Sequence, residues 1–164
     1  MDMIDELLFI KKFREHKAET EMQKSRAHLG VAVQAEQDAQ QILTDHIAHA
    51  TAKELRMFTE LCTRIVKPRD INDVHSEIAM LKFQEQTHQQ ELQNRQEQHV
   101  KARQVFDVDI RKMREASTAR EKFVELAQNF HTMAAREAER KEELELEEVA
   151  SLLREREEWS VEPA

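Results

Sequence analysis

The feature that most constrains this chain is an apolar seam that keeps one heptad phase from Val74 to Ser151. Counting in alternating steps of four and three residues gives 23 positions over eleven heptads, of which 13 are apolar. These positions are Val74, Ile78, Leu81, Glu85, His88, Leu92, Arg95, His99, Ala102, Phe106, Asp109, Met113, Ala116, Arg120, Phe123, Ala127, Phe130, Ala134, Glu137, Lys141, Leu144, Glu148 and Ser151. A repeat sustained over this length predicts a coiled coil.

One stretch, residues 66–73, carries strong helix-breaking signals. Pro68 lacks a backbone donor and disfavours helix at the residue before it. Asp70, Asn72 or Asp73 can each serve as the N-cap of a following helix. The predicted elements are helix one at about residues 3–66, a turn at about 67–72, and helix two at about 73–158.

Composition supports a fold made only of these two helices. The 164 residues include a single Gly and two Pro, which leaves too few turn formers for a many-turned β or α/β fold. Ala, Glu, Lys, Leu and Arg make up 81 residues, the half-share that is typical of long helices. The sequence therefore predicts an all-α single domain, 1–164, folded as a long two-helix antiparallel coiled-coil hairpin with a C-terminal helical overhang.

Helix one has a weaker seam that changes frame near Lys53. The first frame is Ala18, Met22, Ser25, Leu29, Ala32, Glu36, Ala39, Leu43, His46 and Ala50, and the second is Leu55, Phe58, Cys62 and Ile65. This one-residue slip suggests a stutter. A turn centred near residue 70 places residue n opposite residue 140 − n, which sets Phe123 opposite Ala18. Polar seam positions such as His88 and His99 are expected to fix this register.

The segment from about residue 138 to 164 has no intrachain partner in that register and forms the overhang. From Arg136 onward the chain holds eleven Glu against five Lys and Arg, which is −6 of the total net charge of −8. Leu146, Val149, Leu153 and Trp159 follow an apolar helical stripe there. An exposed stripe of this kind suits a groove on another protein.

A second apolar group, which we call the collar, consists of Met57, Leu61, Met80 and Phe83. These residues lie near the turn and partly off the counted seam frames, so they either thicken the local packing or form a partner site. Both readings stay open. The candidate partner-binding residues are Met57, Leu61, Met80, Phe83, Leu146, Leu153 and Trp159.

We expect no catalytic, cofactor or metal site. A two-helix ribbon offers no concave pocket for catalysis, and Glu85-x-x-His88 lacks the second Glu-x-x-His motif that a dinuclear metal site needs. The negative net charge argues against nucleic acid. The longest early apolar run, Leu7 to Ile10, argues against direct membrane insertion, and the lone Cys62 favours a reducing compartment.

Three segments carry a family resemblance: Ala119-Arg-Glu-Lys-Phe-Val-Glu-Leu126, the Glu-rich run from Arg136 to Glu148, and Glu77-Ile-Ala-Met-Leu-Lys82. With the two-helix length, they resemble the YscO family of type III secretion proteins, whose flagellar relative FliJ shares the hairpin. The resemblance implies a stalk seated in a hexameric export ATPase, which also contacts the membrane export gate and binds export chaperones. It implies a place in the bacterial cytoplasm, peripheral to the secretion apparatus, and leaves open whether the protein is itself exported.

We expect the chain to act as a monomer in this role. The main alternative is a generic coiled-coil scaffold or adaptor that forms a homodimer through the same seam. A membrane-surface helix protein is disfavoured by the net charge, and a helical-bundle enzyme or metalloprotein is disfavoured by the missing ligand motifs.

Overall fold

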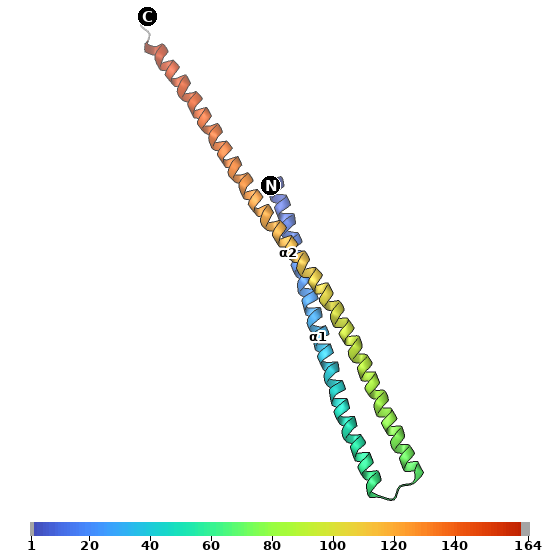
Figure 1. The fold of residues 1–164 in the computed structure, drawn as a ribbon. Coiled ribbons are helices and arrows are strands. Elements are labelled where there is room, and N and C mark those ends of the chain that lie inside the picture. The colour runs from blue at the N-terminus through green and yellow to red at the C-terminus, as the bar shows by residue number, and fades with distance from the viewer. Residues whose placement is uncertain (1, 162–164) are drawn as a thin grey trace. The chain divides into compact units, whose positions relative to one another are not determined.

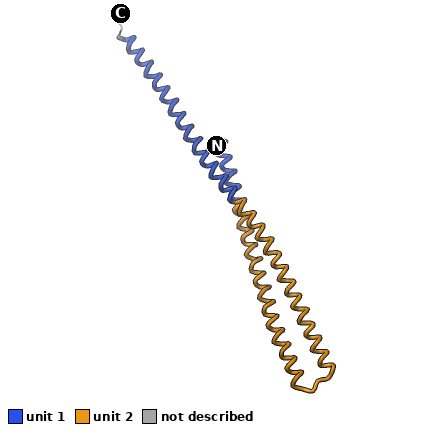
Figure 2. The backbone as a smooth tube through the Cα atoms, viewed as in Figure 1, with its two compact units in different colours: residues 1–17, 114–164 blue, residues 18–113 orange. Residues whose placement is uncertain are grey.

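The computed structural model describes residues 2–161 and contains two long helices (Figure 1). Helix α1 spans Met3–Thr63 and helix α2 spans Pro68–Val161, and no residue in the described range is in a strand. The all-α, two-helix prediction is therefore confirmed. The chain divides into two compact units, of which unit 1 comprises residues 1–17 and 114–164 and unit 2 comprises residues 18–113 (Figure 2). The last three residues of the predicted overhang, 162–164, lie outside the described range.

The turn of unit 2 lies at residues 64–67, earlier than the predicted 67–72. Pro68 is the first residue of α2, not part of the turn. This position suits proline, because the first helical amide has no acceptor inside the helix and the fixed φ of proline is already helical. Helix one correspondingly ends at Thr63, before the predicted residue 66.

Lys67 is the N-cap of α2, so the prediction of Asp70, Asn72 or Asp73 at that position was wrong. Asp70 stands three residues into the helix, where its Oδ2 accepts a hydrogen bond from the backbone N–H of Lys67 at 3.0 Å. The backbone N–H of Asp70 donates in return to the Lys67 carbonyl at 2.9 Å. The bond from the Lys67 N–H to the Asp70 side chain is one of the two hydrogen bonds of a capping box, in which an acidic side chain in the first turn accepts from the backbone N–H of the cap residue.

The predicted seam of unit 2 is confirmed up to Ala50 in α1 and from Val74 to Met113 in α2. Every counted position from Ala18 to Ala50 and from Val74 to Met113 is buried or half-buried. The buried residues of unit 2 are Ser25, Leu29, Ala39, Leu43, Leu81 and Ala102. The core of the unit is therefore a single line of side chains between two antiparallel helices, as expected where only one face of each helix has a partner.

The frame slip predicted near Lys53 is absent. Leu55, Phe58, Cys62 and Ile65 are exposed. Met57 and Leu61 are half-buried and continue the frame that runs through Ala50. Both series have helical spacing, so the last part of α1 has two apolar faces. The predicted seam used the face that contains Leu55 and Phe58, whereas the structure places the face that contains Met57 and Leu61 in the seam.

The register also differs from the predicted sum of 140. In unit 2 the paired residue numbers add to 134 for Ser25 with Asp109 and to 135 for Glu36 with His99. Unit 1 pairs Glu15 with Arg120, again with a sum of 135. The shift of about five residues follows from the early turn, and it invalidates the predicted pairing of Phe123 with Ala18.

Unit 1 pairs the start of α1 with α2 only as far as His131. The Nε2 of His131 lies 3.1 Å from Oδ1 of Asp5, and Ala127 is the most buried residue of the unit. From Thr132 to Ser160 every residue is exposed except the half-buried Ala150. The overhang therefore begins near residue 132, about six residues before the predicted position, and we use the name for residues 132–161 from here on.

Candidate interaction surfaces

Polar side chains are paired across the seam of unit 2. The Ser25 hydroxyl donates to the Asp109 carboxylate, and Nδ1 of His99 donates to the Glu36 carboxylate. The rings of His46 and His88 contact each other with centroids 5.0 Å apart. These contacts connect residues far apart in sequence, so they hold one alignment of the two helices over others.

A further seam residue, Arg95, behaves differently from its polar neighbours. Its guanidinium donates to Glu91 at 2.8 Å and to Gln98 at 3.3 Å, and both partners are on its own helix. By contrast, the seam residue His46 of α1 donates from Nε2 to the carbonyl of Leu81 on α2 at 3.0 Å. The predicted role in fixing register thus has a cross-helix hydrogen bond or ring contact for His88, His99 and Asp109, whereas Arg95 donates its hydrogen bonds within α2.

Unit 1 has its own cross-helix pair in Glu15 and Arg120. The hydrogen bond to the Glu15 carboxylate and the attraction of its charge raise the pKa of the Arg120 guanidinium. Large apolar side chains of unit 1 remain exposed, namely Phe9, Phe13 and Leu126 in its paired section and Met133 at the start of the overhang. Unit 1 therefore keeps apolar surface open along its paired section as well.

The polar pairs of the seam lie at separate points along the two helices. Within residues 2–161, no three His, Cys, Asp or Glu side chains converge in a way that could hold a metal ion. Every buried side-chain nitrogen or oxygen in that range has a hydrogen-bond partner. This spacing of the polar pairs suits alignment of the two helices along the seam.

The structure separates the four collar residues into two kinds. Met57 and Leu61 are half-buried and lie in the seam frame. Met80 and Phe83 are 63% and 68% exposed. Only Met80 and Phe83 therefore present most of their surface to solvent.

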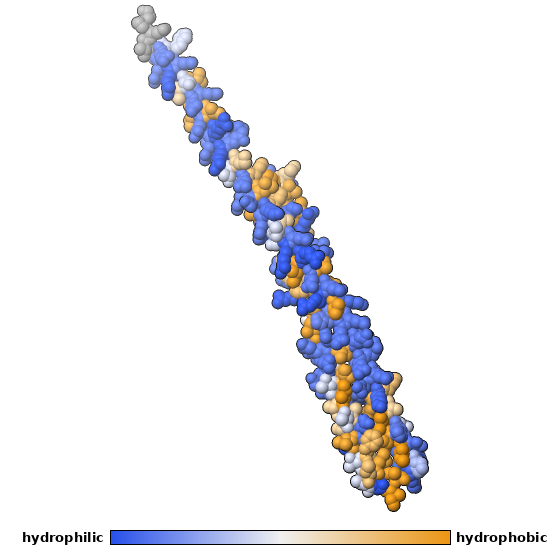
Figure 3. All heavy atoms as spheres, in the orientation of Figure 1, coloured by the Kyte–Doolittle hydropathy of each residue, from blue (hydrophilic) through white to orange (hydrophobic). Residues whose placement is uncertain are grey.

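Sequence reasoning missed an exposed apolar stripe near the same turn. Leu55, Phe58 and Cys62 follow i, i+3, i+7 spacing on α1, and Ile65 in the turn is fully exposed. The predicted seam of α1 includes these residues. Together with the exposed collar residues of α2 they form a group that we call the turn-end set: Leu55, Phe58, Cys62, Ile65, Met80 and Phe83. Figure 3 shows hydrophobic side chains gathered at this end of unit 2 on the visible face.

The overhang carries the other candidate surface. Leu146, Val149 and Leu153 are all more than half exposed and share one face of α2 through i, i+3, i+7 spacing. Trp159 is 81% exposed but lies about a third of a turn away from that face. Its helical neighbour is Leu152, seven residues earlier, which sequence reasoning missed. The overhang thus has two apolar stripes where one was predicted.

The two surfaces differ in charge. Residues 132–161 hold ten Glu against five Lys and Arg, a net charge of −5. Residues 52–85, which include the turn-end set, hold six acidic and six basic residues. The apolar stripes of the overhang lie in an acidic segment, and the turn-end set lies in a neutral one. The two surfaces therefore suit partners of different chemistry. None of the described helices contains a stretch long and apolar enough to cross a membrane.

Together, the paired seam and the open apolar faces define a two-helix coiled-coil protein with surface available for binding other proteins. The sequence profile of the family described as "Type III secretion protein YscO" matches residues 4–152. The chain therefore belongs to the YscO family of type III secretion proteins.

A solved structure agrees with this assignment. The 2.8 Å crystal structure of type III secretion protein YscO from Vibrio parahaemolyticus is similar to this chain, with a TM-score of 0.77 and 26% sequence identity. The match covers 89% of this chain and 92% of the other. No curated protein sequence matches the chain significantly. The resemblance inferred from the three sequence segments is confirmed at the level of the family and the fold.

Proposed function

We propose that this protein is the stalk of a type III secretion export ATPase. In this role it docks in the hexameric ATPase on the cytoplasmic side, contacts the export gate, and binds export chaperones. The observation that carries the proposal is the presence, in a YscO-family chain, of two exposed apolar faces of different charge on separate units. A protein that connects several partners needs such separate faces.

The ATPase supplies the chemistry in this proposal, and the stalk supplies contacts. A bound protein shifts the conformations of the ATPase subunits only if its contacts differ among those conformations. The seam cannot make such contacts, because Leu29, Leu43 and Leu81 are buried between the chain's own helices. The exposed turn-end set and the overhang stripes remain as candidates.

The homodimeric scaffold gains no support from the burial pattern. Dimerisation through the same seam would require residues that already pack against each other within one chain. A scaffold of that kind would have to open the hairpin first, which exposes the whole apolar line at once. No observation of this structure favours that arrangement.

The direct test measures ATP hydrolysis by the cognate hexameric export ATPase with increasing amounts of the intact chain. We expect a saturable rise in turnover. Two variants then locate the contact: Met80→Ser with Phe83→Ser in the turn-end set, and a chain that stops after Glu137. Both changes affect exposed residues, so both variants are expected to keep their helical content.

At least one of these two variants should lose ATPase stimulation, gate binding or chaperone binding. The matched control is Gln90→Ser with Gln93→Ser, a polar change on the exposed surface of α2. If both variants fold and keep all three activities, the chosen surfaces are wrong. If the intact chain shows none of the activities with its cognate partners, the stalk proposal fails and the scaffold alternative replaces it.

A further inference from the structure

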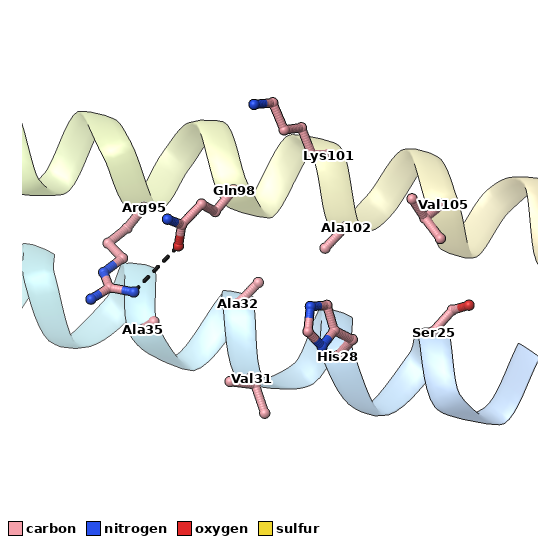
Figure 4. A pocket seen from close by; sticks show the side chains of 10 residues that line it. All are labelled: Ser25, His28, Val31, Ala32, Ala35, Arg95, Gln98, Lys101, Ala102 and Val105. Carbon is pink, nitrogen blue, oxygen red and sulfur yellow. Dashed lines mark hydrogen bonds between the residues drawn. The ribbon is translucent and has the colours of Figure 1, made fainter. Parts of the chain in front are cut away.

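A groove of about 400 Å³ lies between α1 and α2 in the half of unit 2 away from the turn, apart from the surfaces proposed above (Figure 4). Its floor is formed by Ala32, Ala35 and Ala102, and Figure 4 shows Ala32 and Ala102 facing each other between the helices. Alanine methyl groups fill little of the space beside a seam. The groove can therefore admit the side chains of another helix.

The rim of this groove is basic. Lys101 lines it together with Arg95, which is paired with Glu91 of its own helix, and Figure 4 shows Lys101 at the outer edge of α2. The two segments that form the groove, residues 25–35 and 95–105, hold four basic residues against Glu97 alone. The basic residues are Arg26, Arg95, Lys101 and Arg103. This gives a local charge of +3 in a chain whose net charge is −8.

The groove's dimensions suit a helix better than a small ligand. Its lining extends over residues 25–35 of α1 and 95–105 of α2, roughly 15 Å along each helix at ~1.5 Å per residue. An apolar floor with a basic rim selects a helix that has an apolar stripe bordered by acidic side chains. The partner chemistry is therefore an acidic amphipathic helix.

This chain carries such a helix in its own overhang. Leu146, Val149 and Leu153 form an exposed stripe about 10 Å long, by the same rise per residue. Glu145 and Glu147 stand on either side of this stripe by helical spacing. The overhang's charge of −5 is opposite to the +3 of the groove segments.

We propose that the overhang of a second copy docks in this groove, so that the free chain associates with itself. The contact joins two different surfaces of the same protein, and it covers the Leu146, Val149 and Leu153 stripe. It departs from the monomer expected from the sequence. It does not rest on the proposed stalk function, because the contact involves copies of this chain alone.

The test is sedimentation equilibrium of the intact chain over a range of concentrations, at low and at high salt. We expect reversible association that weakens at high salt, since exposed charges are screened over about 10 Å at 0.1 M. Lys101→Glu in the groove should weaken association by about tenfold at low salt. Leu146→Ser with Leu153→Ser in the overhang should weaken it as much or more. Lys12→Glu makes the same charge change outside the groove. It should leave the association constant unchanged once the effect of the altered net charge of the chain is subtracted.

A charge exchange separates docking from a general charge effect. A Lys101→Glu chain mixed with a Glu145→Lys, Glu147→Lys chain should associate more strongly than either variant does alone. Circular dichroism of each variant should show unchanged helical content. A chain that stays monomeric at all concentrations would overturn the proposal, as would association that is unaffected by both the groove and the overhang variants. Both results can be obtained whether or not the chain stimulates an ATPase.

Discussion

Helix α2 has the same periodicity in two regions with opposite surroundings. In unit 2, Leu81 packs against α1 and is buried. In the overhang, Leu146 and Leu153 occupy an equally regular stripe and are 69% and 55% exposed. The residue type and the helix are the same, so the difference lies in whether a partner helix is present. Helical periodicity therefore identifies an apolar face without identifying what covers it.

The largest expected effect comes from making one substitution in both regions. Leu43→Ala removes a buried side chain from the seam of unit 2 and should lower the free energy of unfolding by about 2–3 kcal/mol, the low end for buried leucines because the seam is only one side chain wide. Leu146→Ala removes an exposed side chain and should change stability by no more than about 0.5 kcal/mol. Urea denaturation of both variants measures the contrast, and equal losses would mean that the overhang also packs within the chain.

A smaller effect is expected from the polar pair of Glu36 and His99. Replacing both residues with Leu should raise stability by about 1 kcal/mol, because replacing both partners of a hydrogen bond with apolar side chains can be neutral or stabilising. Replacing His99 alone should lower stability, since the half-buried Glu36 carboxyl group then loses its hydrogen-bond partner. Thermal melts report both changes. If the double variant is less stable than the native chain, the pair stabilises the hairpin beyond its role in alignment.

The smallest effect concerns Gly30, which lies within α1. A Cβ atom built on Gly30 meets no heavy atom within 4 Å, and its φ is not positive. Gly30→Ala should therefore raise stability by about 0.5–1 kcal/mol through the lower entropy of the unfolded chain and better helix propensity. A melting temperature that falls in this variant would show that unit 2 requires flexibility at that position.

The seam could be predicted from the sequence because heptad spacing is a local property. Ala18 to Ala50 and Val74 to Ala127 are all buried or half-buried at the counted positions. The prediction failed beyond Ala50, where Leu55, Phe58 and Cys62 form an apolar series as regular as the one containing Met57 and Leu61. Both faces have helical spacing, and only the position of α2 determines which is buried.

The turn was misplaced for a related reason. Proline is compatible both with a turn and with the first position of a helix, and Pro68 takes the second role. Because Pro68 begins α2, the turn lies earlier than predicted, and every cross-helix pairing is shifted with it. Leu146, Val149, Leu153 and Trp159 could still be recognised as exposed, since α2 beyond the start of α1 lacks a partner in either register, whereas Leu152 was missed.

We propose that the seam holds the fold while the uncovered apolar faces bind the secretion machinery. Hydrogen–deuterium exchange of the intact chain, with and without its cognate hexameric export ATPase, tests it most directly, because amide protection reports local opening segment by segment. We predict new protection in the turn-end set, in the overhang or in both, while exchange at the buried Leu29 and Leu43 stays unchanged. Unchanged exchange at both surfaces, or a change confined to the seam, would contradict the account.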